Sequence, residues 1–230
     1  NIMNEGLEMS LGYNKQWKDF SFNTNYTLTW NKNRVKRLAD GVYNYATGQP
    51  IQMPELSPLT YGHTDARLIL RVGGSMGDVY GQRLPKRDLN GYILNEEGVG
   101  LAMENKETYL GSILPKMNMG WSLGFGYKGV NLGMTFTGRF GGIVISETQS
   151  VLDAGGVQIN QSKVSAQTYH QTIQGTAAYY TYSATNVRLG ELSLSYTLPK
   201  KWFDNKVGMT VGLVGKNLWM IYCKAPFDPE

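Results

Sequence analysis

Residues 18–31 read KDFSFNTNYTLTWN, and apolar and polar side chains alternate along this run. Successive side chains of a β-strand point to opposite faces, so the run predicts a strand with one apolar and one polar side. The apolar side carries an aromatic ring near each end, at Phe20 and Trp30. At ~3.3 Å per residue and a tilt of about 40°, this separation is roughly 25 Å along a bilayer normal, the height of the apolar band of a transmembrane barrel. Because aromatic rings favour both membrane interfaces, the run indicates a strand that crosses a membrane.

The same alternation recurs elsewhere in the chain, at residues 7–14, 121–127, 131–140, 191–198 and 207–213. Together with the first run, these segments predict about six strands, each with an apolar and a polar face. Val187 and Leu189 have the wrong parity for the strand into which they lead. A single extra residue would restore the pattern, so we expect a β-bulge near Gly190.

The connections between the predicted strands are of two kinds. Three are short, at residues 14–18, 127–130 and 199–205, and Gly129 is placed for the positive φ of a tight hairpin turn. Two are long, at residues 39–117 and 141–184, and the first contains a further strand-like segment at 66–80. Short and long connections alternate, so all the short ones lie at one end of the strands. This asymmetry is typical of outer-membrane barrels, with short periplasmic turns and long extracellular loops.

The predicted fold class is all-β: a wall segment of an antiparallel transmembrane β-barrel with about six crossing strands and one loop strand, a single segment over residues 1–230. The smallest closed barrels have about eight strands, and an open edge in lipid leaves backbone groups unpaired. We therefore expect an incomplete barrel. The first residues do not resemble a signal peptide, and the last six include two prolines, which cannot donate to a ladder. These features predict mature protein, or an internal piece of a longer one that lacks its final strand.

The composition excludes several other classes of protein. The 41% hydrophobic residues form no apolar run of about 18, so a transmembrane helix is not expected. The net charge is +4, and Lys and Arg are scattered through loops and turns without a basic stripe, which argues against nucleic-acid binding. The single Cys223 excludes an internal disulfide and a CxxC metal site.

Short motifs that might indicate chemistry have simpler interpretations. Residues 124–129 fit GxGxxG, but a dinucleotide site needs a strand followed by a helix, whereas these residues lie in a predicted hairpin. Asp88 and Gly91 do not have the spacing of a calcium loop, and Asn90-Gly91 favours a turn. His63 and His170 lie in the long connections without a nucleophile or an orienting acid nearby in sequence. We expect no cofactor, no metal and no enzymatic activity.

Three groups of candidate functional residues follow from the predicted faces and loops. A membrane aromatic girdle is expected at Phe20, Phe22, Trp30, Trp121, Phe125, Tyr127, Phe136, Phe140 and Tyr196. Charged residues on the parity of the barrel interior are Glu8, Arg139 and Glu191. Candidates for contact with a substrate or a lid, or for packing of the loops on one another, are Tyr43, Tyr45, Tyr61, Tyr92, Tyr169, Tyr179, Tyr180 and Tyr182.

Several segments resemble the late barrel of SusC/RagA-type TonB-linked outer-membrane transporters of Bacteroidetes. The segments are 109–116, 119–121, 127–129, 138–142, 184–196, 198–199, 215–219 and 225–230. The resemblance covers nearly the whole chain and is weakest at 143–183. It implies a large barrel with an internal plug that imports oligosaccharides or peptides, with energy from the TonB complex and a SusD-like lipoprotein as a lid. The plug, the TonB box and the early strands of that family are absent from this sequence, so TonB would be contacted through a missing N-terminal region.

Two other functions remain open at this stage. A soluble β-sheet module that binds carbohydrate would explain the alternation and the tyrosines, but not the rings at both strand ends or the one-sided long connections. Release of the protein into buffer without detergent would favour that module. A passive porin or adhesin would share the barrel but not the plug and the TonB box. The sequence therefore predicts a piece of an importer in the bacterial outer membrane.

Overall fold

The computed structural model describes residues 1–39, 41–51, 53–92, 94–96, 100–154 and 175–229. These residues are mostly β-strands and belong to two compact units. The six-strand unit comprises Glu5–Lys32, Pro115–Gly141 and Ala184–Glu230, and the four-strand unit comprises Asn1–Asn4, Asn33–Leu114 and Gly142–Ser183. Within the described ranges, no helix has both the length and the apolar character needed to span a membrane.

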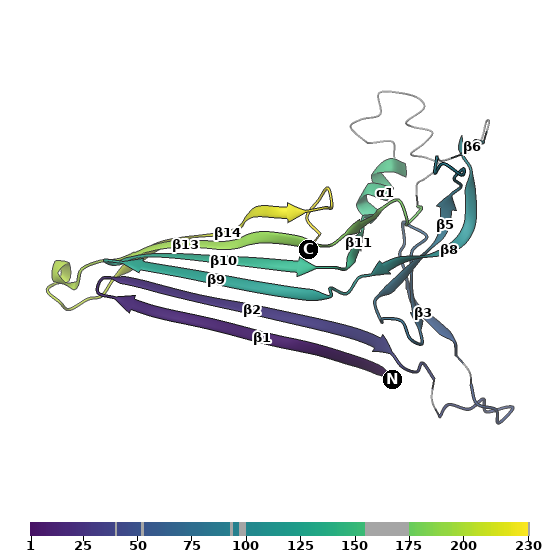
Figure 1. Cartoon of the computed structure of the whole chain (residues 1–230), viewed down its shortest axis with the longest axis horizontal. Coiled ribbons are helices and arrows are strands. Elements are labelled where there is room, and N and C mark those ends of the chain that lie inside the picture. Colours follow the sequence, from purple (N-terminus) through teal and green to yellow (C-terminus); the bar gives the residue numbers. More distant parts are fainter. Residues whose placement is uncertain (40, 52, 93, 97–99, 155–174, 230) are drawn as a thin grey trace. The chain divides into compact units, whose positions relative to one another are not determined.

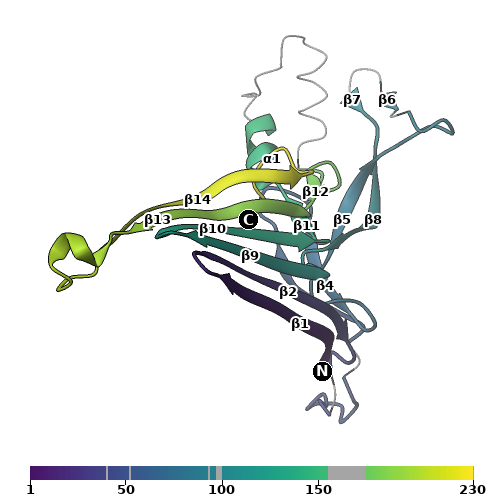
Figure 2. The same ribbon diagram turned by 60° about the vertical axis from the view of Figure 1, so that its left-hand side comes forward.

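The six-strand unit is built on one sheet with the order β1-β2-β9-β10-β13-β14. Figure 1 and Figure 2 show these strands side by side in that order. The pairs β2–β9, β9–β10, β10–β13 and β13–β14 are antiparallel. The predicted set of six crossing strands is therefore confirmed. Their bounds are β1 (Ile2–Trp17), β2 (Phe20–Val35), β9 (Met117–Tyr127), β10 (Val130–Phe140), β13 (Asn186–Thr197) and β14 (Thr210–Cys223).

Short turns join these strands at one end of the sheet. The turn at 128–129 has positive φ at both residues, 46° at Lys128 and 90° at Gly129, which confirms the hairpin expected there. The connection from β13 to β14 contains the 3₁₀ helix η1 (Lys200–Phe203). Neighbouring turns are hydrogen-bonded: Lys128 N donates to Asp19 O at 3.2 Å, and Thr197 N donates to Gly129 O at 2.7 Å. The turns therefore lie in one row.

The expected bulge at Gly190 is present. Against β10, the register passes from Glu191 opposite Thr135 to Leu189 opposite Phe136, so Gly190 is left over. The register against β14 shifts at the same place. This extra residue keeps Leu189 and Leu192 on one face although they are three positions apart, which is how a bulge re-aims side chains.

The four-strand unit contains more sheet than the sequence predicts. Its main sheet has the order β3-β4-β5-β8. The single loop strand expected at 66–80 is instead β4 and the start of β5, two antiparallel strands joined by a tight turn. The bounds in this unit are β3 (Glu55–Thr60), β4 (Arg67–Arg71), β5 (Asp78–Pro85), β6 (Asn95–Glu96), β7 (Gly100–Leu101), β8 (Met103–Ser112), β11 (Ile143–Ile145), α1 (Glu147–Ala154) and β12 (Thr181–Ser183).

Packing and ion pairs hold this second sheet together. Ala66, Val79 and Ala177 form a fully buried core, with Leu110 and Ile143 among the residues packed against it. Arg71 bridges three strands, since its guanidinium lies 2.7 Å from Glu55 of β3 and 2.7 Å from Glu107 of β8. The hydrogen bonds from these carboxylates raise the pKa of Arg71 further above its usual range, so the bridge stays charged.

Candidate functional site

One face of the six-stranded sheet is apolar across five strands. Residues at alternate register positions line up from strand to strand, because the pairings are continuous. One such row is Phe22, Phe125, Leu132, Leu194 and Leu213, and another is Tyr26, Trp121, Phe136, Leu189 and Trp219. The alternation seen within each strand thus becomes a continuous apolar surface.

This apolar face is open to its surroundings. Leu194 is 50% exposed and Leu213 is 78% exposed, and Phe22, Leu123 and Phe136 are only half-buried. A soluble module would need a second layer of protein to cover such a surface, because a large exposed apolar patch is costly in water. The residues instead pack sideways, with ring centroids 5.2 Å apart for Phe22 and Phe125. This arrangement is typical of a surface that faces lipid.

The predicted aromatic girdle residues all lie on this sheet. Phe20, Tyr127 and Tyr196 share the row nearest the turns, and Phe22 and Phe125 share the next row. Trp121 and Phe136 lie two rows further on, and Trp30 and Phe140 both flank Met117 at the far end. The rings are thus distributed along the whole strand length. Contact of these rings with the two bilayer interfaces stays a prediction.

The other face of the sheet is polar and includes the three charged residues predicted for the barrel interior. Glu191 lies opposite Thr135 on β10 and opposite Lys216 on β14, so two opposite charges are direct neighbours. Arg139 lies between Asn118 and Asn186. Glu8 has the parity of Ser10, whose hydroxyl bonds Asn25 on the polar side of β2. Which compartment this face meets stays a prediction.

The glycines of the GxGxxG match make room for neighbouring strands. Gly124 lies opposite Asn23 of β2 and Gly133 of β10. A Cβ built on Gly124 would meet Asn23 Nδ2 at 2.5 Å, closer than real side chains approach. The glycine therefore accommodates a cross-strand side chain, and the hairpin interpretation of this motif is confirmed.

The polar face also carries an ion pair that the sequence does not predict. Arg188 donates from both terminal guanidinium nitrogens to the Asp228 carboxylate, at 2.8 and 3.2 Å. The Arg188 side chain is 9% exposed, so the pair is partly shielded from water. Because Asp228 follows β14 whereas Arg188 is on β13, the pair ties the segment after β14 back onto the sheet. The sequence alone does not indicate this pair, because strict alternation places Arg188 on the apolar face. The bulge at Gly190 moves it to the polar face.

The predicted loop tyrosines fall into different environments. Tyr43, Tyr45 and Tyr92 are exposed, at 63%, 105% and 73%. Tyr61, Tyr179 and Tyr182 are half-buried, whereas Tyr180 is fully buried. Tyr180 therefore packs within the loops, which is the alternative to substrate or lid contact expected for these tyrosines. Tyr169 and His170 lie outside the described residues.

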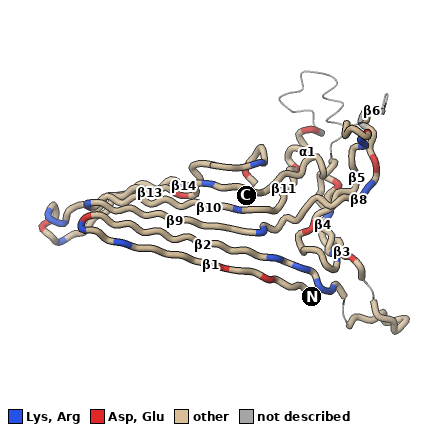
Figure 3. The backbone as a smooth tube through the Cα atoms, in the orientation of Figure 1, with Lys and Arg blue, Asp and Glu red and all other residues tan. Residues whose placement is uncertain are grey.

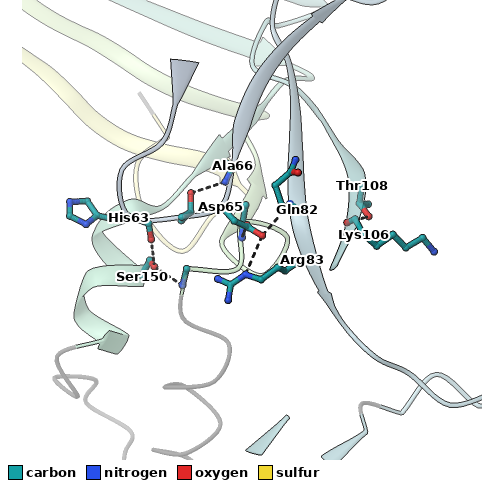
Figure 4. Close-up of polar contacts among 11 residues, drawn as sticks. His63, Asp65, Ala66, Gln82, Arg83, Lys106, Thr108 and Ser150 are labelled. Carbon is teal, nitrogen blue, oxygen red and sulfur yellow. Dashed lines mark hydrogen bonds and ion pairs between the residues drawn. The ribbon is translucent and has the colours of Figure 1, made fainter. Parts of the chain in front are cut away.

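A carboxylate that is only 12% exposed organises one end of the four-strand unit. Asp65 accepts hydrogen bonds from Ala177 N at 2.6 Å and Gln82 N at 3.1 Å, and its carboxylate lies 3.5 Å from Arg83 Nε. Figure 4 shows Asp65 beside Gln82 and Arg83. These contacts join three segments that are distant in sequence.

The histidine in this region contributes through its backbone. Ser150 Oγ donates to His63 O at 2.8 Å and accepts from Gly175 N at 3.1 Å. The His63 ring points away from the Ser150 hydroxyl (Figure 4) and is exposed. Among the described residues, no cluster of three or more His, Cys, Asp or Glu side chains could hold a metal ion.

A buried tyrosine pairs with a buried acid in the same unit. Tyr180 donates its hydroxyl to Asp153 Oδ2 at 2.7 Å, and neither residue is exposed. The pKa of Tyr180 is raised well above its ordinary value, mainly by burial of the phenol and secondly by the neighbouring Asp153. Burial and then Glu147 raise the pKa of Tyr61 in the same direction.

The Tyr180 phenol is expected to ionise at a much higher pH than the exposed tyrosines. Since the folded pKa is raised, the stabilisation is complete below the ordinary pKa of about 10 and is lost as the pH rises through the raised value. Subtracting the tyrosinate absorbance titration of Tyr180→Phe from that of the natural sequence should isolate one step well above pH ~10. A step at the ordinary pKa would contradict the buried pair.

Known proteins resemble this chain over its whole length, although no family model matches it. The TonB-dependent receptor P3 of Formosa agariphila is 25% identical over 262 residues, which cover 100% of this chain and 25% of that protein. The structure of the RagAB peptide transporter matches with a TM-score of 0.67 and 19% identity, over 99% of this chain and 27% of that one. The RagAB peptide importer in the closed-closed state matches with a TM-score of 0.62 and 18% identity, over the same shares.

These matches confirm the resemblance that the sequence motifs indicate. The chain spans about a quarter of the length of these relatives and has their barrel fold over that span. The relatives are outer-membrane proteins, which agrees with the open apolar face of the six-stranded sheet.

Proposed function

We propose that this chain, which resembles the barrel of SusC/RagA-type transporters, forms part of the wall of a TonB-dependent nutrient importer in a bacterial outer membrane. The observation that carries the proposal is the two-faced sheet, whose apolar rows suit contact with lipid and whose polar rows suit a transport path. In the described residues, β1 and β14 are the outermost strands of the sheet. Their free edges suit further barrel strands, since lipid cannot satisfy backbone groups.

The cargo proposed for the complete protein is an oligosaccharide or a peptide, and its proposed partners are a SusD-like surface lipoprotein and the TonB complex. Similarity to a structure described as a peptide transporter supports a transport role. Tyr43, Tyr45 and Tyr92 are the best candidates for contact with cargo or lid, because their rings are exposed. Tyr180 is not retained as a candidate, because its ring is buried.

Uptake by intact cells tests this proposal. Cells that lack the complete protein should lose accumulation of one cargo class, measured with parallel panels of labelled peptides and oligosaccharides. Accumulation should also stop when a protonophore collapses the energy supply of the TonB complex. Uptake that persists without energy would favour the passive porin. Recovery of the protein in buffer without detergent would favour the soluble carbohydrate-binding module.

A further inference from the structure

The turn end of the six-stranded sheet is strongly basic. The turn rim, defined here as residues 15–20, 127–130 and 199–207, contains six lysines against two aspartates and no glutamate. Its excess of four positive charges equals the formal net charge of the whole chain, +4. Figure 3 shows several blue segments at this end of the strands, and others elsewhere along the chain. The lysines, all exposed, are Lys15, Lys18, Lys128, Lys200, Lys201 and Lys206.

The register of the strands makes these charges neighbours. They come from three separate turns, which are joined in a row by the hydrogen bonds from Lys128 to Asp19 and from Thr197 to Gly129. Sequence inspection sees only scattered lysines, because about 70 residues separate the second turn from the third. Once the sheet forms, like charges are held together at a surface. Such an arrangement attracts an anionic counterpart, since the potentials of clustered like charges add.

The counterpart does not come from the described part of this chain. Within the described residues, ion pairs form at Arg71, Arg83 and Arg188 but at none of the rim lysines. The opposite end of the same strands also carries basic residues, and there Glu5, Glu8 and Asp228 accompany them. The turn end has only Asp19 and Asp204 beside its six lysines.

Exposed tryptophans accompany the lysines. Trp17 is 47% exposed and Trp202 is 66% exposed, and Lys200 and Lys201 directly precede Trp202 in η1. The Trp17 ring packs against Phe20 with the ring centroids 5.6 Å apart, at the edge of the apolar face. Amphipathic rings next to lysines fit the head-group layer of a bilayer, where the rings favour the interface and the lysines attract anionic lipids.

We propose that the turn rim binds the phosphate head groups of anionic phospholipids in the leaflet that the turns meet. This inference rests on the membrane location in the proposed function, and it adds a lipid-binding surface to it. Each lysine near an anionic surface is attracted to it, and the attractions of several lysines add. Several lipids bound along the row would fix the depth of the sheet in the bilayer.

Retention of phosphatidylglycerol by the complete protein in detergent tests the rim. The rim variant carries Lys200→Gln, Lys201→Gln and Lys206→Gln. The matched control removes the same charge from the other end of the strands, with Lys32→Gln, Lys116→Gln and Lys224→Gln. Native mass spectrometry should find phosphatidylglycerol bound in preference to phosphatidylcholine, with affinity at least about tenfold weaker in the rim variant and unchanged in the control. Added salt should weaken the binding.

Three results would overturn the lipid proposal. The first is equal phosphatidylglycerol affinity in the natural sequence and the rim variant. The second is an equal loss in both variants, which would mean that only net charge matters. The third is loss of cargo uptake in the rim variant with unchanged lipid binding, which would identify the rim as a docking site for an acidic protein. Normal energy-dependent uptake together with equal lipid binding in the natural sequence and the rim variant would contradict the lipid proposal but not the importer proposal. The two proposals can therefore fail separately.

Discussion

Leu123→Arg is expected to prevent stable assembly of the complete protein in membranes, whereas Ser122→Arg, one residue away on the same strand, should be tolerated. Leu123 belongs to the third apolar row from the turns, between Thr24 and Met134. Ser122 belongs to the polar face, opposite Asn25 and Thr135. An arginine in the middle of the lipid-facing surface of a barrel costs about 2–4 kcal/mol, because hydrocarbon cannot solvate its charge. The folding equilibrium should therefore shift by roughly 30- to 1,000-fold.

The measurement is the folded fraction in lipid vesicles across a urea titration, with heat-modifiable gel mobility as a second readout. Val130→Arg supplies a depth control, because Val130 lies in the row next to the turns. Near the interface the cost of arginine falls to about 0–1 kcal/mol. Equal tolerance of arginine at 122 and 123 would show that lipid does not cover the apolar rows. So would equal sensitivity at 123 and 130.

The six-stranded sheet could be predicted from sequence because its faces meet such different surroundings. Where one side of a strand contacts apolar material and the other a polar region, each residue type is constrained by its parity, as at Phe22 and Asn23. The paired register then joins Phe22 to Phe125 without further information. The bulge at Gly190 was visible for the same reason, as a break in parity.

The four-strand unit gave no comparable signal. Its core consists of small residues such as Ala66 and Ala177, which contact one another only after the chain has folded. Tyr180 and Tyr45 look alike in sequence, yet one is buried against Asp153 and the other is fully exposed. Burial of a loop side chain depends on contacts between distant segments, so local pattern cannot assign it.

The basic turn rim and the Arg188–Asp228 pair were missed because both depend on pairing between strands. Lys18 and Lys128 are more than a hundred residues apart, and only the sheet order makes their turns neighbours. Arg188 and Asp228 are separated by 40 residues and by a bulge that changes parity. Features that arise from register need coordinates, whereas features that arise from alternation do not.

Deletion of Thr135 from β10 is expected to have an even larger effect than a single buried arginine, because it moves a whole half-strand to the wrong face. The pairing of β10 with β9 is continuous and has no register shift, so no bulge residue in β10 can absorb the loss. Strict alternation then turns either Thr137 and Arg139 or Asn131 toward the apolar rows. Either outcome also moves large apolar side chains to the polar face and mismatches several apolar pairs.

The matched control is deletion of Gly190, the residue left over in the bulge of β13. Its loss makes Leu189 and Glu191 adjacent, so Leu189 stays on the apolar face and Glu191 stays on the polar face. The control should therefore fold in vesicles and support cargo uptake, whereas the Thr135 deletion variant should show no heat-resistant folded band and no uptake. A Thr135 deletion variant that folds normally would mean that β10 can shift its register freely, which is incompatible with lipid on one face and a polar region on the other.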